Sequence, residues 1–414
     1  MPSVSLRPLF RICWCLALSA WLFPGVVAAS ELLERRISVD FRHTPLKNAM
    51  EEVARLGQFQ WSYNAAILPA GEKVTLRADN WTVREILFAM LGEDYEFKPS
   101  GNYLILKKRR RPSDELSGYI SDPRTGQRLA NASVYDRRTL RSTTTDDNGY
   151  YRLKKTGREA ELVVAKLGYR DTVLQITSTS PRFQKIELDT FPTQTATQDK
   201  PFWETAYTDV ERFFAKTADR WTELNVRDSL TRQYQVSFLP FVGTNHRLSS
   251  RVRNDYSLNI LAGQSMAVNR LEIGGLANFT RESVNGVQIG GLFNWLRGDN
   301  RGVQVGGLFN IARDTSSGVQ VGGLYNAARH SSGVSGQVAG LNNFAGQGTC
   351  TFQVAGIYNQ ADTVAGVQVA GIANRAKKVR GVQIGLFNSA DSLNGLQVGL
   401  LNRSGRRWLP LLNW

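Results

Sequence analysis

Few residues of this chain could perform acid–base or nucleophilic chemistry, and they lie far apart in the sequence. The three histidines, His43, His246 and His330, fall in different segments. No HExxH, GxSxG or phosphate-binding Gly-Lys-Ser/Thr pattern is present. The acidic stretch 146–149 lacks the twelve-residue calcium loop with its terminal Glu, so it predicts a turn. We therefore expect no enzyme activity, no catalytic or metal-binding residue and no cofactor.

Side-chain amides recur along the C-terminal half at a spacing close to sixteen residues. The clearest copies are residues 286–294, 302–310 and 318–326, and Glu272 with Asn278 marks a diverged first copy. Glycines recur in every copy, so we expect them to be required by the backbone geometry of the repeat and not by binding of one ligand. The repeated amides, which we expect to be structural, are Gln288, Asn294, Gln304, Asn310, Gln320, Asn326, Gln337, Asn343, Gln353, Asn359, Gln368, Asn374, Gln383, Asn388, Gln397 and Asn402.

A short fixed period with β-branched residues and glycine-bounded turns predicts one strand per repeat. In a β-solenoid each repeat is one coil, and the Gln and Asn side chains stack in ladders along the axis. In a barrel each repeat is one strand with antiparallel neighbours. Apolar residues such as Val287 and Ile289 alternate with Gln288 and Gly290, so one face is apolar and the other polar or bare. The motif is roughly palindromic, which would place Gln opposite Asn in an antiparallel pair.

The end of the chain favours the barrel. Counting strands from Tyr234 to Trp414 gives about twelve, an even number like those of bacterial barrels. A last strand that finishes on Trp414 resembles the signal by which outer-membrane barrels are recognised for assembly. Pro240, Pro410 and the uniformly short turns argue against a barrel. We therefore predict an antiparallel β-barrel of about twelve strands over residues 233–414, with a β-solenoid as the alternative.

The array is also similar to a glycine-rich surface repeat of Bacteroidetes and Leptospira envelope proteins. The assignment of the C-terminal half to the cell envelope depends on sidedness, because the apolar face and the amide face of each repeat must meet different environments. Glutamines buried in a dry interior, or valines in contact with bulk water, would remove that assignment.

Residues 36–109 predict a small α+β module. Thr44 is expected to cap a first helix with Pro45 at its start, and Thr82 with Glu85 forms a capping box for a second. The order of elements, the Thr-Pro-Leu-x-x-Ala-Met helix start and the closing Tyr-Leu-Ile-Leu strand resemble the short N-terminal domain of secretins and TonB-dependent receptors. That resemblance implies a periplasmic interaction module whose partner is a regulatory protein.

Residues 115–189 predict a small β-sandwich, because short apolar alternations are separated by Asp, Asn, Gly and Pro. The segments 116–120, 143–151 and 162–169 closely resemble the carboxypeptidase-regulatory-like domain found ahead of many Bacteroidetes outer-membrane receptors. Despite its name, that domain carries no peptidase chemistry. The chain is therefore expected to be multidomain and mainly β.

The N-terminus predicts export. Arg7 and Arg11 precede an apolar run and a small-residue site, so residues 1–29 are interpreted as a signal peptide. Only Cys350 would remain after cleavage, which excludes a disulfide framework within one chain. Residues 190–232 predict a spacer followed by an amphipathic helix.

The formal net charge of +15 would suggest nucleic acid in a cytosolic protein, but an exported chain meets anionic lipids and glycans first. We expect no nucleic-acid partner. The predicted function is a non-catalytic protein of the cell envelope, in the outer membrane with periplasmic N-terminal modules. Its expected partners are the outer membrane, the membrane's assembly machinery and a periplasmic regulatory protein bound through residues 36–109. The alternative is a secreted or surface β-solenoid for adhesion or glycan binding.

Overall fold

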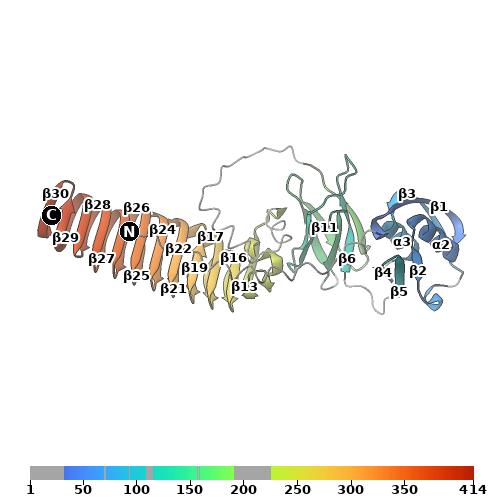
Figure 1. Ribbon diagram of the computed structural model, residues 1–414, viewed down its shortest axis with the longest axis horizontal. Helices are drawn as coiled ribbons and strands as arrows, with labels where there is room; N and C mark the ends of the chain where they lie inside the picture. The colour runs from blue at the N-terminus through green and yellow to red at the C-terminus, as the bar shows by residue number, and fades with distance from the viewer. Residues whose placement is uncertain are drawn as a thin grey trace, which may run out of the picture. The chain divides into compact units, whose positions relative to one another are not determined.

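The computed structural model describes residues 32–190, with gaps at 70, 93, 109–114, 156 and 158, and residues 225–414. The predicted signal peptide and the predicted amphipathic helix within 190–232 fall outside the described residues. Two compact units are present (Figure 1): one comprises residues up to Glu115 together with 181–183, and the other comprises 116–180 and 184–414. No helix in the described part of the chain is long and apolar enough to cross a membrane.

The first unit is a small α+β module. Its elements are β1 (Arg36–Pro45), α2 (Leu46–Gly57), β2 (Gln60–Ser62), the 3-10 turn η1 (Ala65–Ile67), β3 (Lys73–Thr82), α3 (Val83–Leu91), β4 (Tyr95–Ser100) and β5 (Tyr103–Lys108). β1 pairs antiparallel with β3, while β5 pairs antiparallel with β4 and parallel with β2. Both helices bury apolar residues, including Met50, Val53, Ile86 and Leu87, in one core.

The two predicted helix starts have different outcomes. The Thr82 side chain accepts a hydrogen bond from the backbone N–H of Glu85, and the Glu85 side chain accepts from the backbone N–H of Thr82, which confirms the capping box. The predicted Thr44 cap is wrong. β1 continues through Thr44 because that residue pairs with Val74 of β3, so Pro45 takes the cap position without a side-chain hydrogen bond.

Two sheets form a small sandwich in the first part of the second unit. Their strands are β6 (Glu115–Ser121), β7 (Ser133–Asp136), β8 (Ser142–Thr144), β9 (Tyr150–Lys154), β10 (Ala160–Ala165), β11 (Thr172–Ile176) and β12 (Phe183–Glu187). One sheet has the order β11-β10-β7-β8 and the other β12-β6-β9. Apolar residues such as Leu116, Ile120, Leu162 and Val164 fill the core that the sequence alternation predicts.

The rest of the second unit is one continuous stack of β coils. Its elements are β13 (Leu230–Leu239), β14 (Val242–Gly243), the 3-10 helix η2 (His246–Arg251), β15 (Val252–Asn259), β16 (Ala262–Gly274), β17 (Ala277–Val284), β18 (Val287–Gly290), β19 (Phe293–Leu296), β20 (Asp299–Asn300), β21 (Val303–Gly306), β22 (Phe309–Ser316), β23 (Val319–Gly322), β24 (Tyr325–Ser331), β25 (Gly336–Ala339), β26 (Asn342–Ala355), β27 (Tyr358–Ala370), β28 (Ala373–Ile384), β29 (Phe387–Ser404) and β30 (Arg407–Asn413).

Strands one repeat apart pair in parallel and in register along this stack (Figure 1). Gln288 of β18 pairs with Gln304 of β21, which in turn pairs with Gln320 of β23. The last strand, β30, departs from this pattern because it folds back and pairs antiparallel with β29. The C-terminal domain is therefore a parallel β-solenoid.

The antiparallel barrel predicted for residues 233–414 is wrong, and the alternative solenoid is correct. The bend at Gly291 and Leu292 divides a repeat into two strands, β18 and β19, instead of letting it cross as one. Parallel stacking then places each glutamine next to a glutamine and each asparagine next to an asparagine. Such pairs can bond in a continuous row, because every amide side chain has both a donor and an acceptor. The mainly β, multidomain class is confirmed.

Candidate functional site: the solenoid and its junction with the sandwich

A ladder of glutamine side chains runs inside the solenoid. The Nε2 atom of Gln304 donates to Oε1 of Gln288, one coil earlier, over 2.8 Å. The same bond repeats in every coil up to Gln397, with distances of 2.6–2.9 Å. All of these amides are buried. Because a buried polar group without a partner costs about 1–3 kcal/mol, the ladder satisfies groups that would otherwise destabilise the interior.

The asparagines form a second ladder of opposite direction. The Nδ2 atom of Asn294 donates to Oδ1 of Asn310, one coil later, over 2.8 Å. Its other N–H donates to the carbonyl oxygen of Val305, also over 2.8 Å. The pattern continues to Asn402, with Asn–Asn distances of 2.8–3.0 Å. The two rows of amides therefore point their N–H groups toward opposite ends of the solenoid.

A carboxylate begins the glutamine ladder. Gln288 donates from Nε2 to Oε2 of Glu272 over 2.7 Å, and Asn259, Ser265 and Thr280 donate to the same carboxylate over 2.9–3.2 Å. Glu272 is fully buried, and burial raises its pKa more than these hydrogen bonds lower it. Each glutamine of the ladder donates to the residue one coil earlier. The first residue of the ladder has no earlier glutamine to accept its own hydrogen bond, so a carboxylate, which only accepts, suits that position.

Paired glycines leave room for the amides. A Cβ atom on Gly290 would lie 2.4 Å from the carbonyl oxygen of Phe293, which begins the next strand after the bend. A Cβ atom on Gly291 would lie 1.9 Å from the carbonyl oxygen of Gly275, in the coil before. Real Cβ atoms do not come so close to backbone atoms, so both positions need glycine for close approach rather than for a ligand.

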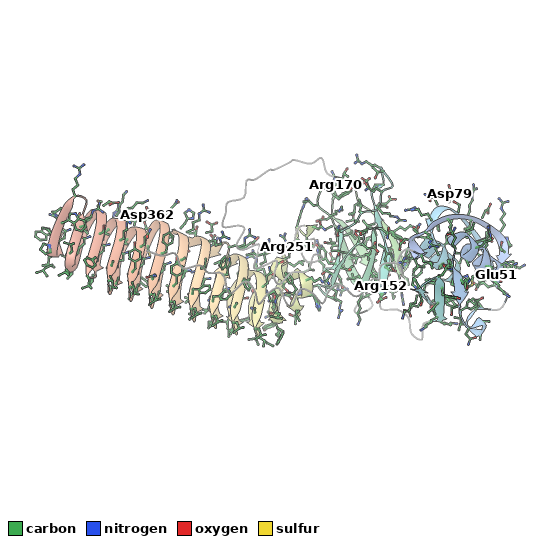
Figure 2. The ribbon with its side chains drawn as sticks, viewed as in Figure 1. Glu51, Asp79, Arg152, Arg170, Arg251 and Asp362 are labelled. Carbon is green, nitrogen blue, oxygen red and sulfur yellow. The ribbon has the colours of Figure 1, made fainter. Side chains whose placement is uncertain are left out.

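The outward side of the solenoid is apolar and exposed to solvent. Val287 has 37% of its surface exposed, and Leu292, at the bend, has 40%. The repeated amides lie in the dry interior instead. Because the valines are exposed and the glutamines are buried, the sidedness of the repeat no longer supports the envelope assignment of the C-terminal half. The charged side chains gather elsewhere on each coil. Figure 2 shows Asp362 at the upper edge of the stack, where its carboxylate lies 2.7 Å from Lys377 Nζ.

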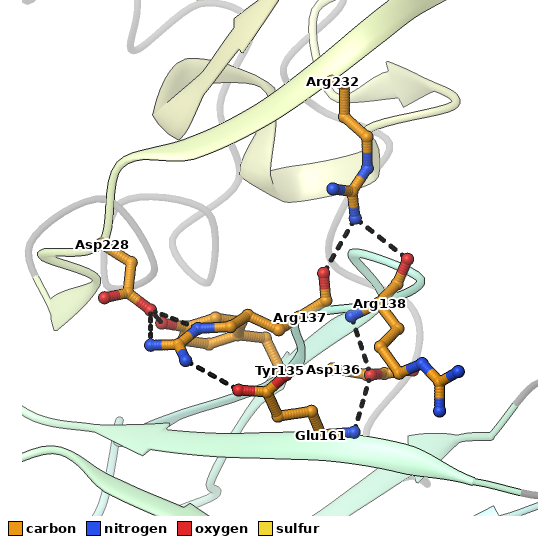
Figure 3. A network of polar contacts seen from close by, with 7 residues as sticks. All are labelled: Tyr135, Asp136, Arg137, Arg138, Glu161, Asp228 and Arg232. Atoms are coloured by element: carbon orange, nitrogen blue, oxygen red, sulfur yellow. Dashed lines mark hydrogen bonds and ion pairs between the residues drawn. The ribbon is translucent and has the colours of Figure 1, made fainter.

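A polar network joins the sandwich to the first coils of the solenoid (Figure 3). The carboxylate of Asp228 accepts from Tyr135 Oη over 2.6 Å and from Arg137 Nη2 over 2.7 Å. Arg137 also contacts Glu161 over 2.7 Å, and Arg232 donates to the carbonyl oxygen of Arg137 over 2.8 Å. The two carboxylates raise the pKa of the Arg137 guanidinium, which therefore keeps its charge.

Apolar packing lies beside this network. Val226, Leu230, Leu248 and Val252 of the solenoid segment cluster with residues of the sandwich, including Val163. Asn225 adds hydrogen bonds to Ser133 Oγ and to the backbone of residues 131 and 167. A shared core with polar bonds around it holds the sandwich and the solenoid as one body.

The sandwich matches a known domain family. A model of the CarboxypepD_reg-like domain family matches residues 116–198. No curated protein and no solved structure matches the chain. The CarboxypepD_reg-like domain therefore accounts for the sandwich, while the first unit and the solenoid lie outside the match.

The three histidines lie on different elements and do not form a common site. His43 lies on β1, His246 begins η2, and His330 lies on β24 with its Nδ1 atom 3.5 Å from Asp314. Asp146 caps the predicted turn, since its Oδ1 atom accepts from the backbone N–H of residue 148 over 3.0 Å. Among the residues that the structure describes, no three His, Cys, Asp or Glu side chains are grouped as a metal site requires.

Two further residues have clear places. Cys350 is buried, and burial raises the pKa of its thiol to about 11, so its thiolate is scarce at neutral pH. Trp414 follows β30, which closes a solenoid, so the predicted barrel-assembly signal has no barrel to serve.

Sequence reasoning missed the groups at the two ends of the glutamine ladder and those at the junction. Asn413 could have been found, because it follows Gln397 by the sixteen residues of the repeat. Glu272 was recognised only as a diverged copy. Arg137 and Asp228 are separated by 91 residues and by a predicted spacer, so no local pattern links them.

Proposed function

We propose that this chain is a non-catalytic protein of the bacterial cell envelope, in which the solenoid is a scaffold and an interaction surface. The N-terminal module, with its resemblance to the short N-terminal domain of secretins and TonB-dependent receptors, would contact a periplasmic regulatory protein. The CarboxypepD_reg-like sandwich would connect that module to the scaffold. The signal peptide interpreted at residues 1–29 supports export.

One observation carries the proposal. The amide side chains that repeat in the solenoid are paired with one another inside it, while apolar side chains cover one outward face. Such a surface has few groups for proton transfer or nucleophilic attack, but it has a large area for binding. A binding scaffold therefore fits this domain better than a catalyst does.

Cell fractionation tests the location. We expect the full chain, expressed in a Gram-negative host, to lose residues 1–29 and to be recovered with the cell envelope. A chain lacking residues 1–29 is the control and should remain in the cytosol. Recovery of the full chain in the cytosol with its N-terminus intact would refute the proposal. If the chain is recovered with the envelope, crosslinking through residues 36–109 should identify the periplasmic partner.

Adhesion to glycans is a second candidate. Phe293 and Phe309 stack on adjacent coils with ring centroids 4.9 Å apart, and Tyr325 follows in the next coil with 36% of its surface exposed. Aromatic rows of this kind present apolar area with a polar edge. Retention of the purified chain on immobilised cell-surface polysaccharide, lost in Tyr325→Ala, would favour this function. Equal retention of the variant would exclude this aromatic row as the site.

A further inference from the structure

One outward face of the solenoid is apolar along the whole stack. We define the apolar face as the outward positions in register with Val287, Ile289 and the bend residue Leu292. The register extends back to Tyr234 of β13 and forward to Leu396 of β29. From β13 to β29 no position in register with Val287 or Ile289 holds a charged residue. Since adjacent strands lie about 4.8 Å apart, the face is about 50 Å long.

Exposure of this face is too continuous to be ordinary surface. Single exposed leucines are common on soluble proteins, but contiguous apolar patches beyond a few hundred Å² mark binding surfaces. The bend residues alone form an unbroken row, and each of Leu292, Leu308, Leu324, Leu341 and Ile357 has about 40% of its surface exposed. Burying such a face removes apolar area from water in every coil, so a partner of matching length would be strongly favoured.

Basic residues border the apolar face on both flanks. Arg270, Arg301 and Arg380 lie one or two residues before positions in register with Val287, namely Leu271, Val303 and Val382. On the other flank, Arg297, Arg313 and Arg329 occupy equivalent positions in successive coils. Each lies four residues after the aromatic residue that follows the bend. Residues 262–414 contain thirteen Lys and Arg against six Asp and Glu, and one of those six, Glu272, is buried inside. The solenoid that carries the face therefore has a positive net charge.

We propose that the apolar face docks on an anionic lipid bilayer. Its aliphatic side chains would enter the boundary between headgroups and acyl chains, while the flanking arginines would reach the phosphates. A second copy is the less suitable occupant, because two copies placed face to face would bring positive flanks together. Interfacial aromatic residues fit the same picture, since Tyr234 and Tyr256 stack at one end of the face and Trp414 is exposed at the other.

The assignment depends on the proposed envelope function only for access to lipid, so purified components test it separately. The purified exported chain should cosediment with vesicles of phosphatidylcholine containing phosphatidylglycerol, and less with phosphatidylcholine alone. Added salt should reduce the difference between the two vesicle types, because it screens the flanking charges.

A pair of bend substitutions tests the face itself. Leu308→Gln combined with Leu324→Gln should weaken partition onto both vesicle types by about tenfold. Leu167→Gln is the matched control, because Leu167 is 57% exposed but lies in the sandwich, between β10 and β11, and not on the solenoid. The control should bind within about twofold of the parent chain. Circular dichroism melting of all three proteins shows whether each remains folded.

Substitutions at the flank test the charge argument. Arg380→Gln with Arg301→Gln should lower the preference for anionic vesicles and leave binding to neutral vesicles unchanged. An equal loss on both vesicle types would overturn the role assigned to the flank.

Three outcomes separate the possibilities. No sedimentation of the parent chain with anionic vesicles overturns the lipid assignment. If the chain is then a dimer that the two bend substitutions dissociate, the face is covered by a second copy. If the chain binds vesicles as expected but is found in the cytosol of cells, the lipid face stands and the proposed envelope function fails.

Discussion

The Nδ2 atom of Asn413 donates a hydrogen bond of 2.7 Å to Oε1 of Gln397, and this bond completes the glutamine ladder. Asn413 is buried on β30, which runs antiparallel to the strand it covers. An asparagine on the returning strand thus replaces the glutamine that a further coil would have supplied. Glu272 accepts the hydrogen bond of the first glutamine, Gln288, and Asn413 donates to the last glutamine, Gln397. Both ends of the ladder therefore have hydrogen-bond partners.

Asn413→Leu should loosen the last coils. The substitution removes the donor and leaves the buried oxygen of Gln397 without it, which costs about 1–3 kcal/mol. Because contacts in a solenoid reach only neighbouring coils, the loss should stay near the end of the stack. Hydrogen exchange should become faster in β29 and β30 and remain unchanged in β18. Leu412→Ala, at an exposed neighbour on the same strand, serves as control and should change exchange little.

Glu272→Gln should stabilise the solenoid at neutral pH. Burial raises the pKa of Glu272 in the folded state, so the folded chain binds more protons than the unfolded chain between the unfolded and folded pKa values. Stability from this group is therefore fully present below the unfolded pKa and falls as pH rises through the folded pKa. The glutamine variant lacks this loss. Its denaturation midpoint should exceed that of the parent at pH 7, and the gap should close as pH falls toward 4.

Glu282→Gln is the matched control for this prediction, because Glu282 is half-exposed and pairs with Arg253 at the surface. It should leave the pH dependence as it is. A Glu272→Gln variant that unfolds at lower denaturant than the parent at pH 7 would show that the four hydrogen bonds outweigh the cost of burying the charge.

Gly291→Ala should separate two coils. The new Cβ atom would meet the carbonyl oxygen of Gly275 at 1.9 Å, and neither backbone can move without breaking the register. We expect a loss of more than about 3 kcal/mol, in the range of severe core substitutions. Gly333→Ala is the comparison, since its Cβ atom has room but its φ of 63° is unfavourable for alanine, at a cost of about 1–2 kcal/mol. Denaturant unfolding followed by circular dichroism distinguishes the two, and equal losses would contradict the close-approach argument.

Asp228→Asn should weaken the junction between the sandwich and the solenoid. The change removes the charge that holds Arg137 and Tyr135, and we expect a loss of about 1–3 kcal/mol at this partly buried network. Exchange of backbone amides should increase in β7 and at the start of β13. Glu159→Gln, which affects only the exposed pair with Arg138, should have almost no effect. If both variants behave alike, the network contributes nothing to the junction.

Local signals in the sequence predicted much of the N-terminal half. The capping box of Thr82 and Glu85 acts within one helical turn, so its residues suffice to place the helix start. The Thr44 cap failed because pairing of β1 with β3 extends the strand through that residue, and such pairing depends on a segment about thirty residues away.

The direction of strand pairing could not be predicted from the repeat. Alternation of Val287 with Gln288 has period two in a barrel strand and in a solenoid strand alike. What distinguishes them is the bend at Gly291, whose need for glycine arises from a carbonyl in the previous coil. The alternation does predict one apolar and one polar face for each repeat. Which face is exposed depends on the fold, because a solenoid encloses the amides, whereas a barrel would turn them toward its lumen.

The opposed senses of the two amide ladders have a consequence for how this domain can change in length. Each coil receives one bond and passes on one bond in both rows, so removal or duplication of a whole repeat leaves every remaining amide matched. The side-chain amides of the two rows point in opposite directions along the axis, so an added repeat adds one amide of each direction. The residues that start and finish the array can therefore stay the same while the number of repeats between them varies.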